Sequence, residues 1–131
     1  MMGWKQLVLL LITVLLLTAC GQNKENTQEV IYMNISAQEA KKIMDTEEGY
    51  VILDVREQEE YDEKHIPGAI VIPHMEIANR AEEVLTDKNQ LILVYCRSGR
   101  RSKIAADALV ELGYTNIKEF GGILDWPYEV E

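Results

Sequence analysis

An apolar strand that ends in a cysteine and a cationic loop constrains this sequence more than any other stretch. Residues 91–95 (LILVY) are apolar and rich in β-formers, and Cys96 follows them directly. Small or cationic residues come next, and a helical pattern begins at about Ser102. Backbone N–H groups converge in such a loop, and the start of a helix adds partial positive charge. This setting favours a thiolate at Cys96 and attracts an anion, so it predicts a nucleophile beside an anion site.

A place in the apolar core is the alternative explanation for Cys96, since free cysteines are often buried. An apolar core does not accept the basic cluster that follows this cysteine, which consists of Arg97, Arg100, Arg101 and Lys103. The chain as a whole is acidic, with a formal net charge of -9. Nucleic acid is therefore not expected as a partner, and the cluster indicates a local anion site.

The N-terminus has the pattern of a secretory leader. Lys5 supplies a positive charge, and residues 7–17 are apolar except for Thr13. This run is shorter than the roughly twenty residues that a membrane-spanning helix needs. The sequence Leu17-Thr18-Ala19-Cys20, followed by a glycine, resembles the lipobox of bacterial lipoproteins.

That resemblance implies a signal peptide over residues 1–19 and a lipid on Cys20. A flexible polar tether then covers residues 20–30, and one folded domain covers residues 31–131. We expect the protein to be exported and anchored by lipid to the outer face of the bacterial cell membrane, or to the periplasmic side of an envelope membrane. An uncleaved anchor and a plain secretory signal are the alternatives.

The cysteine count bears on function, because the sequence has two cysteines. If Cys20 carries lipid, Cys96 is the single thiol of the exported domain and has no internal disulfide partner. A lone exported thiol is open to oxidation, so its presence favours a chemical role. One thiol together with His65 and His74 does not make a zinc ligand set. We therefore expect no metal and no cofactor.

Strand-like and helix-like stretches alternate along the folded part. We expect strands at 31–35, 50–55, 70–72, 91–95 and 116–120, and helices at 37–47, 56–64, 75–85 and 102–112. Ser36 and Glu39 form the capping-box pattern that opens the first of these helices. The alternation predicts an α/β domain with a largely parallel sheet. Sites in such sheets form at the carboxyl ends of the strands, where Asp54 and Cys96 lie.

Four motifs taken together resemble a single rhodanese domain, and the match runs from about Met33 to Trp126. They are Asp54-Val55-Arg56, His65-Ile66-Pro67-Gly68-Ala69, Cys96-Arg97-Ser98-Gly99-Arg100-Arg101-Ser102 and Gly121-Gly122-Ile123-Leu124-Asp125-Trp126. The resemblance implies a small doubly wound α/β domain around a mostly parallel five-stranded sheet. It also implies a sulfurtransferase in which Cys96 takes sulfane sulfur from a donor such as thiosulfate and holds it as a persulfide.

In this interpretation the loop binds the anionic donor, and a thiol or cyanide acceptor removes the sulfur. The substrate-binding residues would be Arg97, Ser98, Gly99, Arg100 and Arg101. Not every arginine need contact the donor, since some can pair with nearby acids. We expect Asp54, Arg56 and His65 to be structural, with Arg56 paired to Glu59 or Glu60, and the protein to be a monomer.

Two other classes of function remain open from the sequence. Cysteine-dependent phosphatases and arsenate reductases of the same fold place five residues between cysteine and arginine, whereas only four separate Cys96 from Arg101. The shorter loop suits a single sulfur atom better than a phosphoryl group. A sulfur carrier or interaction module is the other alternative, and it would load Cys96 but turn over poorly on small acceptors.

Overall fold

The computed structural model describes Gly21 and residues 31–131. The expected signal peptide, the lipidated Cys20 and the rest of the tether lie outside these residues, so they stay predictions. Within the described part of the chain, no helix is long and apolar enough to cross a membrane.

The centre of the fold is a sheet of five strands in the order β1-β5-β4-β2-β3. All of the strand pairings are parallel, which confirms the predicted α/β class and strand number. The strands are β1 (Met33–Asn34), β2 (Val51–Asp54), β3 (Ile70–Val71), β4 (Ile92–Cys96) and β5 (Ile117–Gly122). The central position of β4 places Cys96 in the middle of the carboxyl edge of the sheet.

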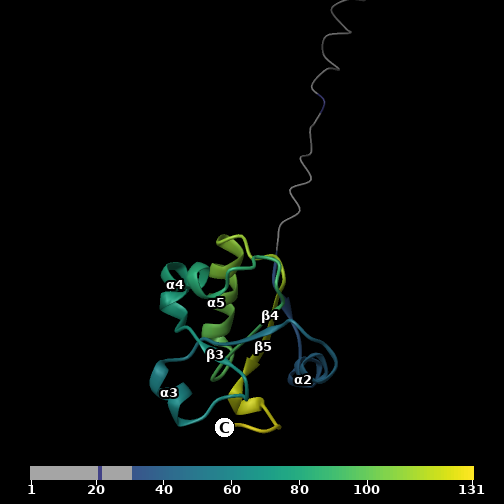
Figure 1. The fold of residues 1–131 in the computed structure, drawn as a ribbon, viewed down its shortest axis with the longest axis vertical. Helices are drawn as coiled ribbons and strands as arrows, with labels where there is room; N and C mark the ends of the chain where they lie inside the picture. Colours follow the sequence, from purple (N-terminus) through teal and green to yellow (C-terminus); the bar gives the residue numbers. More distant parts are fainter. Residues whose placement is uncertain (1–20, 22–30) are drawn as a thin grey trace, which may run out of the picture.

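Helices cover both faces of the sheet (Figure 1). They are α2 (Ala37–Thr46), α3 (Gln58–Glu63), α4 (Ile77–Val84) and α5 (Arg100–Glu111), with short 3₁₀ turns at His74–Glu76 and Ile123–Asp125. Helices α4 and α5 pack on one face and α2 on the other, and each face has its own apolar cluster. Alternation along β4 supplies both clusters, since Val94 faces the α5 side and Leu93 faces the α2 side.

The Cys96 loop is shorter than the sequence predicts. Helix α5 begins at Arg100 instead of about Ser102, with Gly99 as its N-cap. Cations are unfavourable in the first turn of a helix, so Arg100 and Arg101 argue against a helix start that the structure nevertheless adopts. Strand β5 also runs further than the predicted end at Phe120, because Gly122 pairs with Cys96 across the sheet.

Other boundaries agree with the expected pattern to within a few residues. The predicted capping box of α2 is present, since the Ser36 hydroxyl accepts from the Glu39 amide and the Glu39 carboxylate accepts from the Ser36 amide. The helix expected at 75–85 begins as the 3₁₀ turn and continues as α4. Tyr61 of α3 points inward as expected, and its hydroxyl donates to the Ala69 carbonyl at 2.7 Å.

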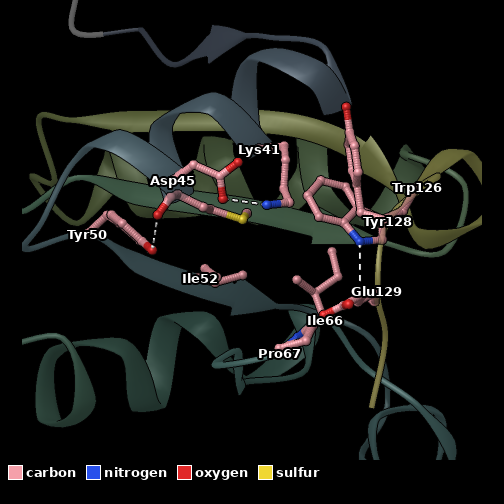
Figure 2. Close-up of a pocket in the computed structure, with 10 residues that line it drawn as sticks. Lys41, Asp45, Tyr50, Ile52, Ile66, Pro67, Trp126, Tyr128 and Glu129 are labelled. Atoms are coloured by element: carbon pink, nitrogen blue, oxygen red, sulfur yellow. Dashed lines mark hydrogen bonds and ion pairs between the residues drawn. The ribbon is translucent and has the colours of Figure 1, made fainter.

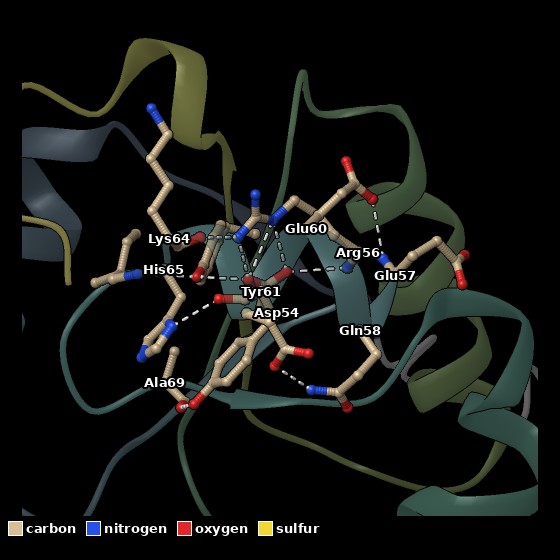
Figure 3. A network of polar contacts seen from close by, with 12 residues as sticks. Asp54, Arg56, Glu57, Gln58, Glu60, Tyr61, Lys64, His65 and Ala69 are labelled. Carbon is tan, nitrogen blue, oxygen red and sulfur yellow. Dashed lines mark hydrogen bonds and ion pairs between the residues drawn. The ribbon is translucent and has the colours of Figure 1, made fainter.

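A buried ion pair joins β2 to the segments that surround the carboxyl edge (Figure 3). The Arg56 guanidinium donates to both carboxylate oxygens of Asp54, with a shortest distance of 2.7 Å, and to the Lys64 carbonyl at 2.7 Å. The Tyr95 hydroxyl donates to the same carboxylate at 2.8 Å and accepts from the Ile66 amide. Burial, reinforced by the Asp54 charge, raises the pKa of Tyr95, so its hydroxyl remains a donor.

This pairing corrects the expected partner of Arg56. The sequence pointed to Glu59 or Glu60, but Asp54 holds the guanidinium from two positions away in the chain. The carboxylate at the end of β2 also accepts from the Arg56 amide at 2.9 Å, so side chain and backbone are fixed together. The structural role expected for Asp54 and Arg56 agrees with these contacts.

We predict that Asp54→Asn destabilises the protein by about 3 kcal/mol or more, because it leaves the Arg56 charge buried without its partner. Urea unfolding at neutral pH measures this change. Asp45→Asn is the matched control, since the Lys41–Asp45 pair is exposed and its loss costs about 0.5 kcal/mol or less. Equal losses in the two variants would contradict the prediction.

Candidate active site

Cys96 lies at the carboxyl end of β4 with its side chain buried. The Gly99 amide donates to Cys96 Sγ at 3.0 Å. Gly99 achieves this with a φ of 104°, a conformation that residues with a Cβ rarely adopt. The same glycine caps α5, so the sulfur lies beside the positive end of the helix. The loop therefore places a backbone hydrogen-bond donor next to the sulfur of Cys96, the thiol that the sequence analysis identified.

The backbone of the loop packs tightly against the end of β5. A Cβ built on Gly122 would lie 1.9 Å from the Arg97 carbonyl oxygen. The next residues continue the contact, since the Leu124 amide donates to that same carbonyl at 3.2 Å. The expected Gly121-Gly122 motif is thus part of the site, because Gly122 allows the Cys96 loop to approach.

The loop residues expected to bind substrate fall into two groups. Arg97, Ser98 and Arg100 are exposed, whereas Gly99 is buried. Neither Arg97 nor Arg100 forms an ion pair with a carboxylate of the described residues. Their guanidinium groups are free to meet an anion that approaches the loop.

Arg101 is engaged elsewhere, with Glu60 of α3. Its guanidinium donates to both carboxylate oxygens at 2.7 and 2.9 Å, a bidentate pair. The Arg101 hydrogen bonds lower the pKa of Glu60 from 4.5 to about 2, and the Glu57 amide and the Arg56 charge add to this effect. Arg101 therefore closes the loop against α3 and adds a positive charge near Cys96.

The sequence did not predict that Ser102 and Glu119 form a hydrogen-bonded line with the Cys96 sulfur. The Cys96 thiol donates to Ser102 Oγ at 3.4 Å, and the Ser102 hydroxyl donates to Glu119 Oε1 at 2.6 Å. Both side chains are buried. The period of two along β5 could have identified Glu119, since it places this acid on the same face as the core residue Ile117.

A hollow of about 630 Å³ lies beside the Cys96 loop and touches it at Arg97. Its lining residues come from α3 and the residues on either side of it, from the Cys96 loop, and from the 3₁₀ turn at Ile123–Asp125 and the residue after it. They are Arg56, Glu60, Glu63, Lys64, Arg97, Ile123, Leu124 and Trp126. Leu124 is 64% exposed, so one side of this hollow, which we call the mouth, is apolar, while Lys64 and Arg97 supply cations. The hollow therefore presents cationic, acidic and apolar side chains together.

A second hollow, of about 210 Å³, lies beside α2 and contains none of the loop residues (Figure 2). Figure 2 shows Trp126, Tyr128 and Ile66 on one side of it and Lys41 with Asp45 on the other. Trp126 also lines the mouth of the Cys96 site. No group of three or more His, Cys, Asp or Glu residues in the described ranges could hold a metal ion.

His65 lies outside the Cys96 loop and has structural partners. Its ring stacks on Tyr61 with centroids 3.8 Å apart, and Nδ1 is 2.9 Å from the Tyr61 carbonyl. Backbone hydrogen bonds in both directions tie His65 to Glu131, the last residue of the chain. These contacts agree with the packing role expected for His65.

The sequence is similar to known proteins over most of its folded part. The model of the rhodanese-like domain matches residues 36–128. The thiosulfate sulfurtransferase PspE of Escherichia coli (strain K12) is 42% identical over 73 residues, which cover 56% of this chain and 70% of that protein. The putative sulfur carrier protein YrkF of Bacillus subtilis (strain 168) is 41% identical over 98 residues, covering 74% of this chain and about half, 52%, of YrkF.

Solved structures show the same architecture. A rhodanese with anions from E. coli is 38% identical and superposes with a TM-score of 0.59, over 63% of this chain and 96% of that one. The rhodanese-like domain of the Anabaena sp. Alr3790 protein is 27% identical with a TM-score of 0.71, over 77% and 80% of the two chains.

We predict that Gly122→Ala destabilises the protein by about 3 kcal/mol and displaces the Cys96 loop, because the new methyl group would overlap the Arg97 carbonyl. Chemical unfolding, with alkylation of Cys96, measures both effects. Gly121→Ala is the neighbouring control: its φ of 87° carries a cost of about 1–2 kcal/mol, but its Cβ meets no atom within 4 Å. A Gly122→Ala variant as stable as Gly121→Ala would show that the close approach is unimportant.

We predict that Glu60→Gln lowers stability at pH 7 by about 1–2 kcal/mol, after allowance for solvent screening. The pKa of Glu60 is lower in the folded protein than its ordinary value of 4.5, so its ionised form favours folding above pH 4.5. That contribution is lost as the pH falls from 4.5 towards about 2. Unfolding measured across this window should show the two proteins converging, and a constant difference would refute the pairing.

Proposed function

This chain belongs to the rhodanese-like domain family, and from that premise we propose that it is a sulfurtransferase that works through a persulfide on Cys96. The donor is thiosulfate or a related anion with sulfane sulfur, and the acceptor is thiophilic. The observation that carries the proposal is the Gly99 amide aimed at Cys96 Sγ from the cap of α5. An amide in that position stabilises negative charge on sulfur, both as a thiolate and beside a persulfide anion.

The loading step begins with loss of the Cys96 proton to solvent. The thiolate electron pair then forms a bond to the outer sulfur of thiosulfate. The sulfur–sulfur bond of thiosulfate breaks, and its electron pair leaves with sulfite. Cys96 is left with one additional sulfur atom that carries the negative charge, and the loop amide and the nearby Arg101 stabilise that charge.

The unloading step is a second attack on the same outer sulfur atom, and Cys96 is now the leaving group. A thiolate or cyanide attacks the outer sulfur, the persulfide bond breaks, and its electron pair returns to Cys96. Donor and acceptor thus react in separate halves of the cycle, which is a ping-pong mechanism. The roomy, partly apolar mouth near Leu124 supports an acceptor larger than cyanide.

The two alternative functions left open by the sequence differ in how well they are supported. A sulfur carrier is supported by the similarity to the putative sulfur carrier protein YrkF. A carrier would load Cys96 in the same way but pass its sulfur to one dedicated partner. An oxyanion-binding phosphatase is less well supported, because Arg101 is paired with Glu60 and so is not free to clamp a phosphoryl group.

The location of this chemistry stays a separate proposal. The lipobox-like sequence before Cys20 supports an exported domain held at a membrane by lipid. Two or more acyl chains would be needed for stable anchoring, since a single chain gives only marginal binding.

We predict that the protein transfers sulfur from thiosulfate to cyanide and that Cys96→Ser abolishes the transfer while retaining the fold. Steady-state rates at several cyanide concentrations should give parallel double-reciprocal lines, since the persulfide separates the half-reactions. Far-UV circular dichroism serves as the control for folding. Transfer that persists in Cys96→Ser would contradict the mechanism, and loading without turnover would favour the carrier.

We predict that Arg97→Ala and Arg100→Ala each raise the KM for thiosulfate about tenfold at low salt, since each removes a charge-assisted contact to a dianion. Both are exposed and lack ion-pair partners among the described residues, so stability should change by less than about 0.5 kcal/mol. Unchanged KM values in both variants would place donor binding on the loop amides alone.

A further inference from the structure

A continuous line of hydrogen bonds runs from the nucleophile into the protein, away from the mouth. It passes from Cys96 Sγ to Ser102 Oγ at 3.4 Å and from Ser102 Oγ to Glu119 Oε1 at 2.6 Å. The Gly121 amide donates to that same Oε1 at 2.8 Å, which fixes the carboxylate on β5. The reaction proposed above uses neither Ser102 nor Glu119.

Glu119 is unusual because it is a carboxylate that is only 2% exposed and has no ion-pair partner among the described residues. The other buried acid, Asp54, is neutralised by Arg56. A buried charge without a cation is costly, so hydrogen bonds must hold the Glu119 carboxylate. The carboxylate accepts from the Ser102 hydroxyl at 2.6 Å and from the Gly121 amide at 2.8 Å, so the serine makes the shorter bond.

The single proton of a hydroxyl group can serve only one acceptor at a time. Ser102 has a second possible acceptor in the Gly121 carbonyl, at 3.4 Å, but the 2.6 Å contact with Glu119 is much shorter. While Ser102 donates to Glu119, it presents a lone pair to Cys96. A lone pair favours a protonated thiol, which can donate to it, over a thiolate, which cannot.

We propose that Glu119 is a positioning residue that, through Ser102, keeps the proton on Cys96 while the site is empty. This inference rests on the proposed sulfurtransferase function and adds a control on its nucleophile. The Gly99 amide, the start of α5 and the Arg101 charge lie beside the sulfur and attract negative charge. Glu119 opposes them from the buried side.

This opposition has a chemical use. A thiolate that ionises too readily is a weaker nucleophile, and the best attacking thiol is one balanced near the ambient pH. A thiolate that is always present is also more open to oxidation, which matters for a domain whose single thiol is Cys96. The serine and the glutamate would therefore moderate the effect of the cationic loop.

Among the described residues, Tyr32 is a titratable group that lies near Glu119: burial raises the pKa of Tyr32, and the charges of Asp107 and Glu119 raise it further. Arg101 lies near Cys96 from α5.

In the test, the folded protein is treated with iodoacetamide at a series of pH values from about pH 5 to about pH 9. The extent of alkylation of Cys96 is then measured on the peptide that contains it. Glu119→Gln retains an oxygen that accepts from Ser102 and Gly121 but removes the charge. We expect the pH of half-maximal alkylation to fall by about one unit in this variant. An unchanged profile, or a shift to higher pH as expected for a proton-accepting base, would overturn the proposal.

The route through Ser102 is tested by a double-mutant cycle. The shift caused by Glu119→Gln should be much smaller in a Ser102→Ala background, because the hydroxyl that transmits it is gone. An equal shift in both backgrounds would show a direct charge effect and overturn the role of Ser102. Asp107→Asn is the control, since it removes an exposed carboxylate from the same helix and should leave the profile unchanged.

Two further variants decide the matter if Glu119→Gln does not fold. Ser102→Ala removes the acceptor of the thiol proton and should shift the profile to lower pH, whereas Ser102→Thr keeps a hydroxyl and should retain the wild-type profile. A Ser102→Ala profile that is unchanged or shifted to higher pH would contradict the proposal. Alkylation needs no sulfur donor, so these results are independent of whether thiosulfate is a substrate.

Discussion

The close approach of two backbone segments is the constraint on which the site depends. The loop after β4 lies so near the end of β5 that no Cβ fits on Gly122, where it would be 1.9 Å from the Arg97 carbonyl. Strands β4 and β5 pair up to that point, with Cys96 opposite Gly122. The loop can then turn sharply at Gly99, whose amide faces the sulfur. A side chain at position 122 would separate the nucleophile from the segment that shapes its surroundings.

Ion pairs fix the rest of the carboxyl edge around that contact, and they divide the arginines by role. Arg56 is buried against Asp54 and ties β2 to the Lys64 carbonyl. Arg101 is held by Glu60 and joins the loop to α3. Arg97 and Arg100 are exposed and form no ion pair with a carboxylate of the described residues, which is why we propose them as the contacts for an incoming anion. The cationic cluster thus contains arginines that are paired with carboxylates and arginines that are not, and only the three-dimensional structure separates the two kinds.

The sequence was sufficient for the fold and for the position of Cys96 at the end of a central strand. Alternating patterns predicted the strands and helices, and the place of Cys96 at a strand end followed from the apolar run before it. The start of α5 was misplaced because its first turn contains two cations, which local preference disfavours. The Asp54–Arg56 pair is local, but the pairing of Arg101 with Glu60 and the contact of Ser102 with Glu119 join elements that are far apart in the chain. Such contacts depend on side-chain directions that a single sequence does not specify.

The central claim is that Cys96 accepts a sulfur atom, and the most direct measurement is the mass of the intact protein before and after exposure to thiosulfate. We expect the wild-type protein to gain the mass of one sulfur atom, cyanide to remove it, and Cys96→Ser to show no gain. A protein that gains no sulfur, although iodoacetamide still alkylates its Cys96, would contradict the account and turn attention to another donor or to oxyanion chemistry.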